Sequence, residues 1–184
     1  MAFLSLYATP VLAALPAGFQ IETVATDLNI PTSMAFTPDG RIFVAEKGGA
    51  VKIIKNGLLL ETPLVTLSDV NTYGDRGLLG IAVDPSFASN GYIYLMYTYE
   101  NTPGFNFAAS KTGRIVRLTV SGDTASEATK VVLLGTVGGN VTNPSCDNYA
   151  IGTDCIPSDS PSQFSCCVTF RSRWQIVCKY GRRF

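Results

Sequence analysis

Five cysteines and the absence of any histidine limit the chemistry that this 184-residue chain can perform. Cys146 and Cys155 bracket a short loop, and two cysteines so placed in an exported protein most simply form a disulfide. Two free, buried thiols are the alternative for this pair. The other three cysteines fall in the last segment of the chain, at positions 166, 167 and 178. Because the pair has no histidine or further cysteine near it, we predict no metal site there.

Asp75 and Arg76 are the charged residues best placed to bind a substrate, directly before the run Gly77-Leu-Leu-Gly80. A carboxylate accepts a hydrogen bond from a hydroxyl, and functional residues are common in loops on a rigid scaffold. We therefore expect a substrate-binding role for this pair. The alternative is an exposed turn pair that adds little to stability. Turn formation is the expected role of four other acidic residues: Asp84, Asp123, Glu127 and Asp154.

The distribution of charge separates the last segment from the rest of the chain. The net charge of zero is a cancellation, because all fourteen acidic residues precede Phe164 whereas five of the fourteen Lys/Arg follow Gln163. The part before Phe164 thus has nine basic against fourteen acidic residues, a charge of −5. An acidic body gives no electrostatic reason to expect a nucleic-acid partner, and we predict none.

The first 16 residues are apolar, and no charged residue precedes Glu22. This stretch is too short to span a membrane and has the length of the apolar region of a secretory signal. Residues 1–16 are therefore expected to be the remnant of a signal peptide, and the protein to be exported to the periplasm or secreted. A buried first strand is the alternative, but Pro10 and Pro16 disfavour it.

Short apolar segments separated by Gly, Asn, Asp and Pro turns predict an all-β protein. The chain is 46% hydrophobic and 15% charged, which excludes a disordered chain. Two stretches, MAFTPDGRIFVAE (34–46) and IAVDPSFASNGYIYLMY (81–97), share one layout: a strand, a turn with Asp and Pro, then Gly, one residue, Ile and an aromatic residue. Gly40 and Gly91 mark the two copies. Repeats of about 40–50 residues built from hairpins are typical of β-propeller blades.

These same segments resemble the N-terminal part of the glucose/sorbosone dehydrogenase family, the soluble quinoproteins. The resemblance rests on LNIPTSMAFTPDGRIFVAEKGGAVKIIKNG and, more specifically, on GDRGLLGIAVDPSFASNGYIYLMYTY. It implies a six-bladed propeller that is exported and binds pyrroloquinoline quinone (PQQ) with calcium. The implied reaction is oxidation of a sugar at its anomeric carbon, in which a histidine takes the hydroxyl proton and the quinone takes hydride.

The resemblance also implies that the chain is an incomplete propeller. Six blades of about 40–50 residues need at least about 240 residues, so 184 residues supply about three to four blades. Residues 17–163 are expected to form this N-terminal part of the propeller. The quinone and calcium ligands of the family come mostly from later blades, so we do not expect the fragment to bind either group.

Gln163 stands where the family has its histidine, so no catalytic residue is intact in the chain as written. An amide cannot take a proton near neutral pH. The position that matches Asp75 is usually Gln in the sugar dehydrogenases of the family. Aspartate there adds negative charge and loses a hydrogen-bond donor, which leaves the sugar undefined.

Residues 164–184 are interpreted as a frameshifted, non-native tail. If one extra nucleotide sits at the codon of Gln163, permitted codon choices let the shifted frame read HSVVALRFAPDGKLFVSTGDGAS. That reading restores the histidine, and its Pro-Asp-Gly hairpin matches residues 34–50 as a third copy of the repeat. A genuine basic tail is the alternative.

Two functions follow from the resemblance. The first is a fragment of a PQQ-dependent aldose or glucose dehydrogenase acting on the CH-OH group of sugars, inactive as written. The alternative is a non-catalytic extracellular propeller that binds a carbohydrate or a protein, because fold alone does not give function. An unrelated β-sandwich is the third possibility, and it would lack blade-like sheets.

Overall fold

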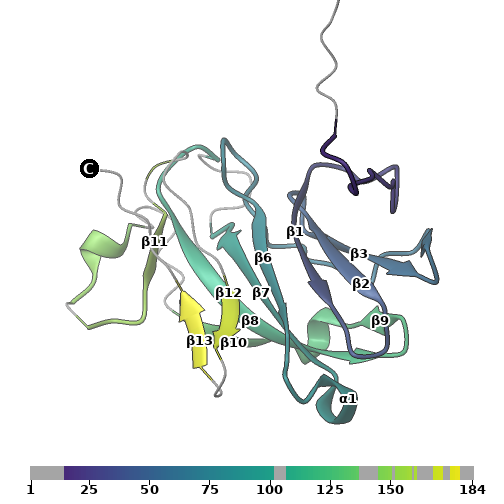
Figure 1. Cartoon of the computed structure of the whole chain (residues 1–184). Coiled ribbons are helices and arrows are strands. Elements are labelled where there is room, and N and C mark those ends of the chain that lie inside the picture. Colours follow the sequence, from purple (N-terminus) through teal and green to yellow (C-terminus); the bar gives the residue numbers. More distant parts are fainter. Residues whose placement is uncertain are drawn as a thin grey trace, which may run out of the picture.

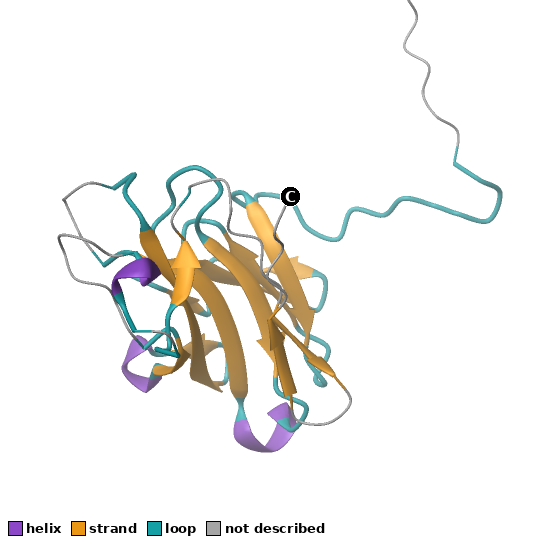
Figure 2. Ribbon diagram, turned by 90° about the vertical axis from the view of Figure 1, so that its left-hand side faces the viewer, coloured by secondary structure: helices purple, strands orange, loops and turns teal. Residues whose placement is uncertain are grey.

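The computed structural model describes residues 15–101, 107–136, 145–150, 152–158, 160, 168–171 and 175–178. Within these ranges the chain consists of antiparallel strands joined by turns, and its helical segments are three or four residues long. Two sheets lie side by side, and a small hairpin lies beside the second (Figures 1 and 2). The predicted all-β fold is confirmed.

The first sheet is a meander in which β1 to β4 pair in the order of the chain. β2 lies between β1 and β3, and both β4 and β5 add to the outer side of β3. Its strands are β1 (Pro31–Phe36), β2 (Ile42–Glu46), β3 (Ala50–Lys55), β4 (Leu58–Leu59) and β5 (Val65–Thr66). The Pro-Asp-Gly turn between β1 and β2 is closed by a 3.0 Å hydrogen bond from Gly40 N to the Thr37 carbonyl.

The second sheet has the order β6, β7, β8, β10, and β9 and β11 also pair with the long strand β8. Its strands are β6 (Leu78–Val83), β7 (Tyr92–Tyr99), β8 (Lys111–Ser121), β9 (Thr124–Ala125), β10 (Val131–Leu134) and β11 (Ile156–Ser158). Three short helical turns lie between them: α1 (Phe87–Asn90), η1 (Glu127–Thr129) and η2 (Cys146–Asn148).

The two copies of the sequence repeat occupy equivalent places. The first copy forms β1 and β2, and the second forms β6 and β7, which are the first two strands of each sheet. Gly40 and Gly91 both adopt positive φ, at 84° and 64°, where a residue with a side chain would be strained. The copies differ because the second contains the short helix α1 before its glycine. Equivalent four-stranded meanders, one after the other, are the arrangement of neighbouring blades.

A third hairpin follows in the last segment. β12 (Val168–Arg171) pairs antiparallel with β13 (Gln175–Cys178). β12 lies against β6, as β6 lies against β1, so the first strands of three successive units are neighbours. The first described strand of the last segment thus lies beside β6 as β6 lies beside β1.

The main hydrophobic core lies between the two sheets. Fully buried side chains from the first sheet, such as Phe43 and Ile53, meet Leu95 and Leu118 of the second. The rings of Phe43 and Phe87 make an edge-to-face contact at 6.0 Å. A second, smaller cluster covers the other face of the second sheet, and its buried members are Ala82, Tyr94, Met96 and Ile115.

The connection between β8 and β10 reaches back to the first sheet and joins the two. Ala125 N donates a 2.7 Å hydrogen bond to the Leu64 carbonyl. Asp123 forms ion pairs with Arg41 at 3.0 Å and with Lys55 at 2.6 Å. The two sheets are therefore joined by polar contacts at the rim as well as by their shared core, which gives the loops at the other end a rigid base.

Candidate functional site

The loop that precedes β6 and the connection between β7 and β8 meet at one end of the two sheets. Asn71 N donates to the Thr98 carbonyl at 2.9 Å, and Glu100 N donates to the Asp69 carbonyl at 2.8 Å. An isolated bridge joins Val70 to Tyr99. These backbone bonds fix the loop of residues 67–77, which carries the two residues predicted to bind substrate.

Asp75 and Arg76 have opposite environments in this loop. Asp75 is exposed, whereas Arg76 is fully buried. The Arg76 Nη2 atom donates a 2.8 Å hydrogen bond to the carbonyl of Ser158 in β11. The alternative interpretation, an exposed turn pair, is therefore wrong for Arg76. Asp75 is the member of the pair that faces solvent, and substrate binding by it stays a prediction.

A buried ion pair lies behind the loop. Lys111, at the start of β8, has no exposed side-chain surface, and its ammonium lies 2.9 Å from Glu100 Oε1. Asn71, also fully buried, donates through Nδ2 to Glu100 Oε2 and, at 2.9 Å, to the Phe107 carbonyl. Sequence reasoning missed all three polar side chains, because nothing in the local sequence marks them as buried.

A second polar cluster surrounds Asp69. Its Oδ2 atom accepts hydrogen bonds from Lys130 Nζ at 3.0 Å and from Tyr97 OH at 3.1 Å, and Arg114 Nη1 lies 3.5 Å away. Burial and the adjacent Asp69 carboxylate raise the pKa of Tyr97 far above its usual value, so this phenol stays protonated and acts as a donor. The cluster anchors the beginning of the 67–77 loop to β7 and β8.

Lys47 holds the other end of the loop. Its ammonium donates to the Gly74 carbonyl at 2.5 Å, and its own carbonyl accepts a 3.0 Å bond from Leu78 N. Gly77, with φ 151°, lies so close that a Cβ atom there would sit 2.7 Å from the Lys47 carbonyl oxygen. A glycine is required at this position for both reasons.

Gly77→Ala is expected to lower the free energy of unfolding by about 1–3 kcal/mol, the usual cost of a strained backbone position. This figure applies if the loop does not move away from the Lys47 carbonyl. Chemical denaturation measures the change. Gly48→Ala is the matched control, because a Cβ atom there meets nothing within 4 Å. Equal stability of the two variants would show that the Lys47 contact does not constrain the loop.

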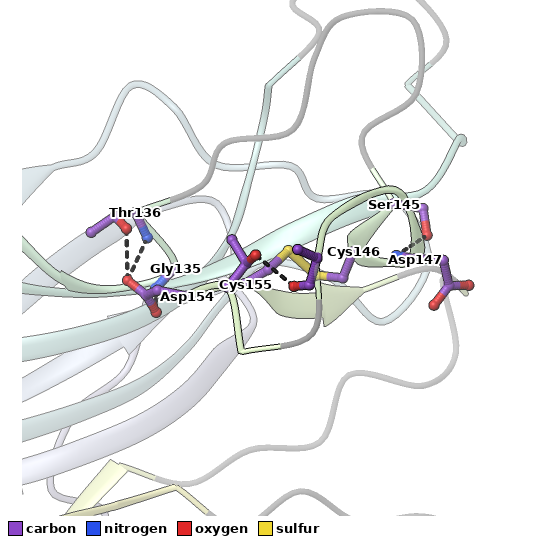
Figure 3. The surroundings of a disulfide bond; sticks show 9 residues. Gly135, Thr136, Ser145, Cys146, Asp147, Asp154 and Cys155 are labelled. Carbon is purple, nitrogen blue, oxygen red and sulfur yellow. Dashed lines mark hydrogen bonds between the residues drawn. A yellow bond between two sulfur atoms is a disulfide. The ribbon is translucent and has the colours of Figure 1, made fainter.

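The chain enters β11 through a disulfide-closed loop, which Figure 3 shows. Cys146 and Cys155 are bonded, with their Sγ atoms 2.00 Å apart. Asp154 accepts hydrogen bonds from Gly135 N at 2.9 Å and from Thr136 Oγ1 at 2.7 Å. Burial alone would raise the pKa of Asp154, but these bonds outweigh it and lower that pKa. The loop is thus tied to the end of β10 just before β11 begins.

Replacing both Cys146 and Cys155 by serine is expected to cost about 2–3 kcal/mol of unfolding free energy, because the cross-link restricts the unfolded chain. Thermal melts of the variant and of the unsubstituted chain measure this cost. Dithiothreitol should lower the melting temperature of the unsubstituted chain to that of the variant and leave the variant unchanged. A variant as stable as the oxidised chain would contradict the prediction.

Gln163 lies outside the described residues, as do residues 1–14. Among the residues that the structure describes, no three His, Cys, Asp or Glu side chains lie close enough to hold a metal ion. No helix in the same ranges is long and apolar enough to cross a membrane.

Comparison with known proteins identifies the family. The glucose/sorbosone dehydrogenase model matches residues 28–143, which include the first sheet, the second sheet except β11, and the 67–77 loop. The chain belongs to this family. The match begins just before β1, and the first copy of the repeat lies wholly within it.

Three curated relatives place the chain within the glucose/sorbosone dehydrogenase family. The aldose sugar dehydrogenase YliI of Escherichia coli K12 is 31% identical over 103 residues, which cover 55% of this chain and 28% of that protein. The quinoprotein glucose dehydrogenase B of Acinetobacter calcoaceticus is 30% identical over 86 residues, or 45% and 18% of the two chains. Mouse hedgehog-interacting protein is 34% identical over 86 residues, or 42% and 12%.

A solved structure of the glucose/sorbosone dehydrogenase family agrees with the fold. A glucose dehydrogenase of Thermus thermophilus, described as an oxidoreductase, superimposes with a TM-score of 0.50 and 30% identity, over 59% of this chain and 29% of that one. Propeller architecture is thereby confirmed for the part of the chain that aligns. The chain spans less than a third of the length of each of these four proteins.

Proposed function

We propose that the complete protein is a PQQ-dependent dehydrogenase that oxidises the anomeric CH-OH group of an aldose. The observation that carries the proposal is the family match over residues 28–143, together with a quinoprotein glucose dehydrogenase and an aldose sugar dehydrogenase among the relatives. The quinone would supply the redox chemistry. Its ligands and those of calcium would come mostly from the remainder of the complete protein.

Asp75 is the described residue that we propose to contact the sugar. Its side chain is exposed, and the loop around it is held in place at both ends. Lys47 binds the Gly74 carbonyl at one end, and the Asp69 cluster fixes the other. Its carboxylate can accept hydrogen bonds from sugar hydroxyls and cannot donate any. A fixed acceptor next to the reacting hydroxyl orients the substrate, which lowers the entropic cost of the reaction.

We propose further that residues from Gln163 onward are read out of frame, and that the restored frame places a histidine at position 163 as the general base. The position of β12 and β13 supports this, because the restored repeat aligns residues 168–171 and 175–178 with the first hairpin, 34–37 and 41–44. Sequencing the gene across codon 163 tests the proposal. Codons after Ser162 that cannot encode the shifted peptide would refute it.

The domain boundaries follow from these proposals. Residues 1–16 would be the remnant of a signal peptide, 17–163 the N-terminal part of the propeller, and 164–184 the misread segment. Export to the periplasm or to the medium would permit the Cys146–Cys155 disulfide, since disulfides persist in oxidising compartments.

The alternative is a non-catalytic extracellular propeller that binds a carbohydrate or a protein. The resemblance to hedgehog-interacting protein favours it, as does the absence of histidine from the chain as written. The discriminating experiment expresses the complete gene in its restored frame, adds PQQ and calcium, and measures dye-linked oxidation of a panel of aldoses. Turnover of an aldose supports the enzyme. Absence of turnover, with saturable sugar or protein binding, supports the binding module.

A further inference from the structure

We propose that Arg76 is a positioning residue that fixes β11, and through it the start of the segment leading to position 163, rather than a residue that touches the sugar. The functional meaning of position 163 rests on the proposed function, whereas the contact itself does not. Arg76 is fully buried and donates from Nη2 to the Ser158 carbonyl at 2.8 Å. These two residues are 82 positions apart in the sequence.

A closed set of buried contacts surrounds this hydrogen bond. Ser158 pairs with Lys111 in the register of β11 and β8. The Lys111 ammonium contacts Glu100, and Glu100 in turn accepts a hydrogen bond from Asn71. Asn71 belongs to the same loop as Arg76. These contacts therefore join three segments that are remote in sequence: the 67–77 loop, the connection between β7 and β8, and β11.

The chemistry of the guanidinium suits a fixing role. Arginine keeps its charge at any physiological pH, so the donor is always present. A hydrogen bond from a charged donor in a water-excluded environment is stronger than a neutral one at the surface. Because no part of Arg76 is exposed, a sugar hydroxyl cannot reach it while the loop holds its place. The exposed neighbour Asp75 is the residue that a sugar can meet.

The short distance along the chain makes the contact relevant to the site. Position 163 is five positions after Ser158, and five steps of the chain reach about 18 Å at most. The two anchors of β11, Arg76 on one side and the disulfide-closed loop on the other, therefore restrict where the base can be placed. A displacement of about 1 Å at a catalytic group can cost about 100-fold in rate.

Hydrogen exchange of the 184-residue chain tests the positioning directly. In Arg76→Met, the amides of Ile156 and Ser158 should exchange at least about 10-fold faster, whereas amides of β2 and β3 should not change. Pro157, between them, has no amide hydrogen to report. Arg76→Lys should restore part of the protection, because an ammonium can still donate to the carbonyl. Unchanged protection of the Ile156 and Ser158 amides in Arg76→Met would overturn the proposal.

Ser158→Ala is the matched control for this experiment. The Ser158 hydroxyl has no hydrogen-bond partner in the described part of the chain, and the substitution keeps the backbone carbonyl that Arg76 binds. Protection should therefore stay as in the unsubstituted chain. Should Arg76→Met fail to fold, Arg76→Lys decides. Loss of protection confined to the Ile156 and Ser158 amides supports positioning, and equal loss throughout both sheets overturns it.

Kinetics in the complete, frame-restored protein separate positioning from sugar binding. Arg76→Met should lower kcat by about 10-fold or more and leave KM for the aldose within about twofold. A raised KM with unchanged kcat would show that Arg76 binds the sugar and would overturn the proposal. If the unsubstituted complete protein oxidises no aldose, the proposed function fails, whereas the exchange experiment still decides the role of Arg76.

Discussion

Lys111→Met is expected to lower the free energy of unfolding by about 3–5 kcal/mol, the typical cost of breaking a buried ion pair by removing one partner. The Lys111 ammonium is fully buried, and Glu100, which it contacts at 2.9 Å, is nearly so. Loss of the ammonium leaves the Glu100 carboxylate charged and desolvated, with the neutral Asn71 amide as a donor in place of a cation. Urea denaturation followed by far-ultraviolet circular dichroism measures the change.

Two further variants identify the cause of that loss. Lys111→Met combined with Glu100→Gln removes both charges and keeps an acceptor for Asn71, so it should recover more than half of the lost stability. Lys52→Met removes a lysine whose ammonium makes an exposed hydrogen bond to the Glu61 carbonyl, and it should change stability by less than about 0.5 kcal/mol. A Lys111→Met chain within about 1 kcal/mol of the unsubstituted one would contradict the ion-pair account.

The second large effect concerns position 163 in the complete protein. In the complete protein read in the restored frame, the form with histidine at position 163 is expected to have a kcat for aldose oxidation about 10²–10⁴-fold above a matched form that keeps Gln163, the usual contribution of a general base. KM should change little, because the base acts on the proton transferred in the transition state. Steady-state kinetics with PQQ, calcium and an excess of electron acceptor measure the ratio.

The pH profile distinguishes a base from a structural residue at this position. A histidine with an ordinary pKa of about 6.5 accepts a proton only when it is neutral, so kcat should fall as the pH drops below about 6.5. The Gln163 protein should show no such step. Equal kcat and identical pH profiles for the two proteins would contradict the assignment of the base.

Several of the strands could be predicted from the sequence because they depend on local signals. The Pro-Asp-Gly turn and the repeated layout located β1, β2, β6 and β7, and positive φ at Gly40 and Gly91 explains the glycines. Turn formation by Asp84 is confirmed, since its carboxylate accepts a 2.8 Å bond from Ser86 N. The same carboxylate also accepts from Tyr94 OH at 2.6 Å, a contact that only the folded sheet creates.

The polar interior of the candidate site could not be predicted, because it depends on partners remote in the sequence. Arg76 has the local sequence of a surface turn, and its burial requires Ser158 of β11. Asp123, which was expected to serve only a turn, pairs with Arg41 and Lys55 of the first sheet. A single sequence contains no signal that brings such residues together.

The most direct test of the central claim is an anaerobic single-turnover experiment on the complete, frame-restored protein loaded with PQQ and calcium. Addition of an aldose without any external acceptor should reduce the bound quinone, observed as a change in its absorption spectrum with one equivalent of sugar oxidised per quinone. Asp75→Ala should slow this reduction or weaken its dependence on sugar concentration. A protein that binds PQQ stoichiometrically, yet leaves it oxidised with every aldose at millimolar concentration, would contradict the dehydrogenase account.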